Sequence, residues 1–127
     1  MPADDPRASF YLALDLYNRG DYLGSQELLE TVYAASEVQD QPLVRALLML
    51  ASGMHLHFHR GGGRGALNLF RNSLVALDDF RPRRLGVDVD ELYQALEAYV
   101  DDLKDRRKPG AGFLDRWLAP RIRYEKP

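Results

Sequence analysis

The stretch PLVRALLMLASGMHLHFHR, residues 42–60, decides the fold. Its apolar residues are spread around the whole circumference of a helix instead of lying on one stripe, and a helix of this kind is surrounded by other elements. Pro42 is a natural first residue for the helix, and the glycines at 61–63 end it. We therefore expect this helix at the buried centre of the domain. Its core residues are Leu43, Val44, Leu47, Leu48, Leu50, Ala51 and Met54.

Helical periodicity continues outward on both sides of this segment. Asp21 follows a glycine and is a good N-cap, and Asp88 with Glu91 resembles the start of a capping box. We find no convincing alternation of apolar and polar residues, so no strands are predicted. The sequence predicts an all-α fold, a single compact bundle of about five helices plus a short C-terminal helical segment. The four further helices are expected at about residues 7–19, 22–36, 64–79 and 88–107.

The chain has 127 residues, the length of one domain, with a bundle expected over residues 1–107 and a linker with an amphipathic, basic extension over 108–127. Cysteine is absent, which excludes disulfides and thiolate chemistry. The net charge of −2 argues against binding to nucleic acid. From residue 105 onward the chain has seven Lys or Arg and three Asp or Glu, which gives this end a net charge of +4. The preceding residues have a net charge of −6. Because we find neither a signal peptide nor a membrane span, we expect a cytoplasmic protein.

Several blocks of the sequence resemble those of a known family. The stretches LYNRGDYLGSQELLETVY, LVRALLMLASGMHLHFHRGGGRGALNLFRNSLVALD and LGVD are similar in order and spacing to the family catalogued as domain of unknown function 309. The resemblance covers roughly residues 16–102 and implies a compact all-α bundle with no assigned activity. By position it places the family's polar residues at Glu27, Glu30, His55 and Asp88. The family's histidine, tryptophan and glutamine are replaced here by Gln26, Tyr33 and Arg45.

One candidate site is a polar cluster between the second and third helices, formed by Gln26, Glu27, Glu30, Arg45, His55 and His59. Its two glutamates are three residues apart and its two histidines four apart, so each pair shares a helix face. Facing carboxylates and imidazoles could ligate a metal. The alternative is a hydrogen-bonded cluster that fixes helix register, with the arginine pairing an acid. His57 lies about 200° around the helix from His55, so the three histidines cannot form one site.

A second candidate is the glycine-rich turn Arg60, Gly61, Gly62, Gly63 and Arg64. Consecutive glycines beside arginines at a helix N-terminus can form an anion-binding nest. The turn matches neither a Walker loop nor a dinucleotide fingerprint. The alternative is a flexible turn between antiparallel helices in which a glycine supplies the C-cap.

The third candidate is the apolar segment Phe113, Leu114, Trp117 and Leu118, which follows a Pro109–Gly112 linker. Side chains this apolar are expected to be buried, since each contributes about 1.5–3 kcal/mol on burial. Either the segment folds back on its own bundle, or it holds a partner, which includes a second copy of the chain. Both alternatives predict that Trp117 is substantially buried.

These features favour a non-enzymatic interaction or structural module that needs no cofactor. One alternative is a small metal-binding protein or enzyme that uses Glu27, Glu30 and His55. A weaker alternative is the binding of an anion or nucleotide at the glycine-rich turn. The sequence identifies no substrate or partner.

Overall fold

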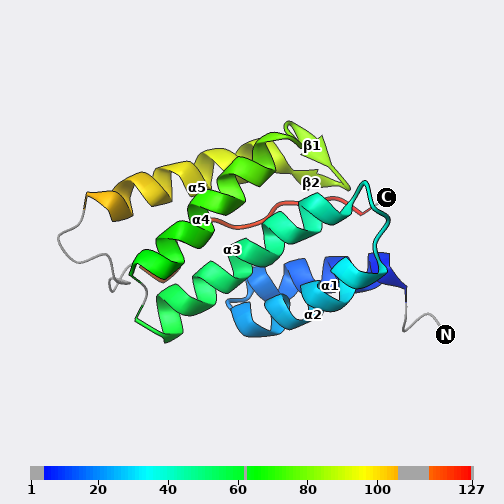
Figure 1. Ribbon diagram of the computed structural model, residues 1–127, viewed down its shortest axis with the longest axis horizontal. Coiled ribbons are helices and arrows are strands. Elements are labelled where there is room, and N and C mark those ends of the chain that lie inside the picture. Colours follow the sequence, from blue (N-terminus) through cyan, green and yellow to red (C-terminus); the bar gives the residue numbers. More distant parts are fainter. Residues whose placement is uncertain (1–4, 62, 106–114, 127) are drawn as a thin grey trace.

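The structure of the protein, a computed structural model, describes residues 5–61, 63–105 and 115–126 (Figure 1). Within these residues the chain forms five long helices, a two-stranded hairpin and one short helix, which confirms the predicted all-α bundle. The long helices are α1 (Pro6–Asn18), α2 (Tyr22–Ala35), α3 (Gln41–His59), α4 (Arg64–Asp78) and α5 (Val89–Lys104). The remaining elements are β1 (Arg83–Arg84), β2 (Val87–Asp88) and α6 (Asp115–Leu118).

Aspartate side chains cap the first turns of α1, α2 and α5 and so fix where these three helices begin. The side chain of Asp5 accepts a hydrogen bond from the backbone N–H of Arg7 (3.0 Å) at the start of α1. Asp21 accepts one from the backbone N–H of Gly24 (2.9 Å) at the start of α2, as the sequence predicts. Each cap satisfies a backbone donor that the first turn of a helix leaves without an intrahelical partner.

Consecutive helices pack against one another, and α3 lies between α2 and α4 (Figure 1). Eight of its apolar or small residues from Leu43 to Met54 are buried, whereas Leu48 is half-buried. The approach of α4 is close, because a Cβ atom at Gly53 would lie 2.7 Å from the ring of Phe70. Its central position confirms what the distribution of apolar residues on α3 predicts.

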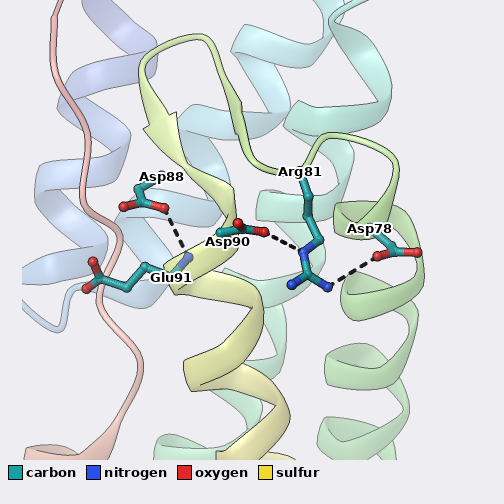
Figure 2. Close-up of polar contacts among 5 residues, drawn as sticks. All are labelled: Asp78, Arg81, Asp88, Asp90 and Glu91. Carbon is teal, nitrogen blue, oxygen red and sulfur yellow. Dashed lines mark hydrogen bonds and ion pairs between the residues drawn. The ribbon is translucent and has the colours of Figure 1, made fainter.

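The hairpin that joins α4 to α5 is not predicted from the sequence, because two-residue strands are too short to show alternation. Its two-residue turn holds Leu85 and Gly86 at positive φ (51° and 78°), as a tight hairpin turn requires. Figure 2 shows the Arg81 guanidinium between two carboxylates just before the hairpin, 2.6 Å from Asp90 and 3.4 Å from Asp78. These ion pairs tie the end of α4 to the beginning of α5.

The described C-terminal residues return along the bundle and lie between α1 and the beginning of α5 (Figure 1). Residue Val87 of β2 forms an antiparallel bridge with Tyr124. No helix in the described part of the chain has the length and apolarity needed to cross a membrane.

Candidate interaction surface

The C-terminal strap, which we define as residues 115–126, is anchored in the core at its first residue. Asp115 is only 2% exposed, and its Oδ2 lies 3.7 Å from Nε2 of His57. The same nitrogen lies 2.9 Å from the hydroxyl oxygen of Tyr99 on α5. His57 is also buried, with its ring edge-to-face against Phe70. This buried polar cluster therefore holds the start of α6 against α3 and α5.

The middle of the strap is fixed by α1. The hydroxyl of Tyr17 donates a 2.7 Å hydrogen bond to the carbonyl of Pro120. Asn18 pairs with the backbone of Ile122 in both directions, since its Nδ2 donates to the carbonyl and its Oδ1 accepts from the N–H, each at 2.8 Å. The side chain of Ile122 is 2% exposed. Burial raises the pKa of the Tyr17 hydroxyl well above its ordinary value, so this donor stays protonated.

The end of the strap binds the hairpin and α1. The Tyr124 hydroxyl donates a hydrogen bond to the Asp15 carboxylate, and its ring stacks on that of Tyr11 with centroids 5.1 Å apart. The hydrogen bond to Asp15, with burial, raises the pKa of Tyr124 to about 12. The N–H of Glu125 donates to the carbonyl of Gly86 (2.8 Å).

The first turn of α5 also contributes to this anchoring. The backbone N–H of Asp88 donates to the carbonyl of Arg123 (2.9 Å). The Asp88 side chain accepts from the N–H of Glu91 (3.0 Å), as Figure 2 shows, and so caps α5. Glu91 in turn places its carboxylate 3.1 Å from the guanidinium of Arg123. The capped helix start and the strap thus stabilise each other.

Between these anchors the strap presents two large apolar side chains to solvent. Trp117 is 83% exposed and Leu118 is 63% exposed, although the residues on either side of them, Asp115 and Pro120, are buried. The strap docks on its own bundle through Ile122 and Tyr124, whereas the two described residues of the predicted docking segment, Trp117 and Leu118, do not pack against it. Trp117 is exposed in the single chain, so its burial in a complex stays a prediction. Phe113, Leu114 and the Pro109–Gly112 linker lie outside the described residues.

The predicted polar cluster between α2 and α3 has a different geometry. Four of its members are exposed, and only Gln26 and His55 are half-buried. The rings of His55 and His59 lie 5.2 Å apart, but no hydrogen bond or ion pair joins members of the cluster within the described residues. Among all the residues that the structure describes, no group of three or more histidines and carboxylates could hold a metal ion. Besides His59, the exposed members of the predicted cluster are Glu27, Glu30 and Arg45.

The glycine-rich turn connects α3 to α4. Gly61 and Gly63 have positive φ values of 85° and 86°, and the backbone N–H of Arg60 donates to the carbonyl of Leu56 (3.0 Å). The positive φ of Gly61, directly after the C-cap Arg60, is typical of a glycine-terminated helix, and Gly63 is the N-cap of α4. Arg60 and Arg64 are both exposed, and Gly62 lies outside the described residues.

The role of His57 was not predicted from the sequence, although a signal for it is present there. Helical period places His57 three residues after Met54 and seven after Leu50, on the apolar face of α3. A histidine there needs a polar partner, and the Tyr99 hydroxyl supplies it from α5, 2.9 Å from Nε2. Asp115 lies 3.7 Å from the same nitrogen, 58 residues later in the chain.

Comparison of the chain with models of protein families gave no match, and neither curated proteins nor solved structures gave one. The class that the observations define is a small all-α protein, with five long helices and one short helix in the described part of the chain. The resemblance to the domain of unknown function 309 family stays a prediction.

Proposed function

We propose that this protein is a non-enzymatic interaction module, and that Trp117 and Leu118 are the side chains that anchor its partner. The observation that carries the proposal is the exposure of both residues on a turn whose two flanks are fixed to the bundle. Burying a large apolar side chain contributes about 1.5–3 kcal/mol. Because the turn is already held in place, less conformational entropy is lost when a partner covers it.

The neighbouring charge indicates the chemistry of the partner. Arg121 is exposed, and no ion pair is formed by its side chain within the described residues. Tryptophan and arginine are the residue types most enriched among the side chains that dominate binding energy. We therefore propose a protein partner that offers an apolar pocket with acidic groups at its rim.

A photo-crosslinking residue at position 117 tests this proposal in the cell of origin. The matched control is the same residue at Val75, which is 75% exposed on α4. We expect a defined protein to crosslink from position 117 and not from position 75. With that protein purified, Trp117→Ala should weaken binding by about 30-fold, which is the effect of a 2 kcal/mol hot spot. Val75→Ala should leave the affinity within twofold.

Two results would contradict the proposal, and a third would identify the partner as a second copy of the chain. Equal affinities of the Trp117→Ala and Val75→Ala variants would show that Trp117 is not an anchor. If vesicles containing anionic lipid shift the emission of Trp117 to the blue and no added protein does so, the binding partner is a membrane surface and not a protein. A shift that follows the concentration of the protein alone would identify a second copy of the chain as the partner. Circular dichroism of both variants verifies that the fold is retained.

A further inference from the structure

A pocket of about 600 Å³ lies at the end of the bundle where α1 begins. Its wall is built from the first turns of α1, the last turn of α2, the start of α3, the hairpin turn and the end of the strap. Trp117 is not among its lining residues. Pockets for small molecules typically measure about 300–1,000 Å³, so this one has the size for such a ligand.

The buried part of the pocket wall is mainly apolar. Phe10, Tyr11, Val32 and Val44 line the pocket, and all four belong to the buried core of the bundle. Leu85 adds a half-buried apolar side chain from the hairpin turn. An apolar ligand would therefore meet a surface that the fold has already formed.

The charged groups that line the pocket are nearly balanced in number, and most of them face solvent. Four are carboxylates and three are cations, and they belong to Asp5, Glu37, Asp40 and Glu125 and to Arg7, Arg83 and Lys126. Six of these seven residues are exposed, and the half-buried one, Asp40, lies 2.8 Å from the guanidinium of Arg84. A charged ligand would lose hydration at the apolar wall without meeting a clear excess of opposite charge. The lining therefore favours a ligand that has no net charge.

Two hydroxyl groups on the wall are left as hydrogen-bond acceptors. The hydroxyl of Tyr11 donates its hydrogen to the carbonyl of Leu85 (3.0 Å), and the hydroxyl of Ser36 donates its hydrogen to the carbonyl of Val32 (2.6 Å). A hydroxyl has one hydrogen and two acceptor lone pairs, so each oxygen can still accept a hydrogen bond but cannot donate another. These two groups complement a ligand that donates a hydrogen bond.

We infer that this pocket binds a small uncharged molecule of the alcohol class, with an apolar body and one hydroxyl that donates a hydrogen bond. The apolar body packs on Phe10, Val44 and Leu85, and the hydroxyl donates to the oxygen of Tyr11 or Ser36. The inference does not depend on the proposed partner of Trp117, because different residues form the two sites.

An NMR titration of the full chain with four ligands of similar size tests this inference. Hexanol should cause saturable shifts of backbone amides at the pocket, such as that of Leu85. Its isomer methyl pentyl ether cannot donate a hydrogen bond and should bind about fivefold more weakly. Hexanoate and hexylammonium should each bind about tenfold more weakly than hexanol. Heptanol should bind about fourfold more tightly, since it adds one CH₂ group to the buried body.

Removal of the two hydroxyls tests the role of the acceptors. In the double variant Tyr11→Phe and Ser36→Ala, hexanol and the ether should bind with equal affinity. The affinity for the ether should be the same as in the unchanged protein, which verifies that the pocket itself is retained.

A bulky side chain at the wall provides a further, independent measurement. Ala35 lines the pocket at the end of α2 and is exposed, so Ala35→Trp should occupy the pocket without disturbing the core. It should abolish hexanol binding. Ala34→Trp, on an exposed neighbour that does not line the pocket, is the matched control and should bind normally.

The inference would be overturned if hexanol gave no saturable shifts, or if Ala35→Trp bound it as well as the unchanged protein does. Tighter binding of hexanoate or hexylammonium than of hexanol would show that the pocket selects a charged ligand. Equal binding of hexanol and the ether by the unchanged protein would show that the two hydroxyls recognise no donor. Either of these results would also overturn the inference.

Discussion

Replacing Gly86 by alanine should release the end of the strap from the hairpin. Gly86 has a φ of 78°, and its carbonyl accepts a 2.8 Å hydrogen bond from the N–H of Glu125. A Cβ atom at this position would lie 2.0 Å from the carbonyl oxygen of Glu125. Because that atom belongs to the backbone, no side-chain rotation relieves the clash, and the strap itself has to move.

The size of the effect follows from three separate contributions. A non-glycine residue in the left-handed region loses about 1–2 kcal/mol. Displacement of the strap breaks the hydrogen bond between Gly86 and Glu125, which contributes about 0.5–1.5 kcal/mol. It also loosens the contact of Tyr124 with Tyr11, an aromatic pair that contributes about 0.5–1.5 kcal/mol. Gly86→Ala should therefore lower the free energy of unfolding by about 2–5 kcal/mol.

Gly20→Ala is the matched control, because Gly20 has a φ of 87° but no atom within 4 Å of its added Cβ. It should lose only the backbone contribution of about 1–2 kcal/mol. Urea unfolding of both variants measures the difference, and hydrogen exchange at the Glu125 amide reports the strap directly. Equal losses of stability with the Glu125 amide still protected would refute the reasoning.

Three other perturbations test the core, the first anchor and the last anchor of the strap. Leu47→Ala should lower the free energy of unfolding, measured in urea, by about 2–5 kcal/mol. Leu48→Ala should lower it by clearly less, since Leu47 is fully buried and Leu48 is half-buried. Equal losses would contradict the placement of α3. Asp115→Ala leaves its histidine partner buried, so it should reduce stability by about 1–3 kcal/mol and lower the fluorescence anisotropy of Trp117, whereas unchanged anisotropy would mean that α6 is held elsewhere. The pKa of the Tyr124 hydroxyl is raised from 10.0 to about 12, so the contribution of this group to stability is complete below pH 10 and is lost as the pH rises through 12. In Tyr124→Phe the urea midpoint should therefore fall less between pH 9 and 11 than it does in the unchanged protein.

Local sequence signals predicted the helices of this fold, because the interactions that define them lie within a few residues of each other. The caps Asp21 and Asp88 act on backbone groups three residues later, so they are visible in a short window of sequence. The burial of α3 could be predicted because its apolar residues leave no face for solvent. The hairpin escaped prediction because two paired residues per strand carry no periodic signal.

The anchors of the strap could not be predicted in the same way. The partners Tyr17 and Pro120 are 103 residues apart, and Asn18 and Ile122 are 104 apart. Asn18 is the last residue of α1 and an ordinary residue type for a helix end. Nothing in the neighbouring sequence therefore indicates that its side chain pairs with the backbone of a distant segment. Contacts of this kind depend on how the first and last helices are placed, which is a property of the assembled bundle.

Trp117 is exposed in the single chain for a physical reason that concerns the whole strap. Hydrophobicity requires that the segment dock, but it does not choose which of its apolar side chains turn inward. From Arg121 to Glu125 inward and outward positions alternate as in a strand, and Ile122 and Tyr124 take the inward ones. The buried Asp115 fixes the preceding turn at the same time, so Trp117 faces solvent without any loss of the contacts that hold the strap. A partner that covers Trp117 would therefore meet a site that needs no rearrangement of the bundle.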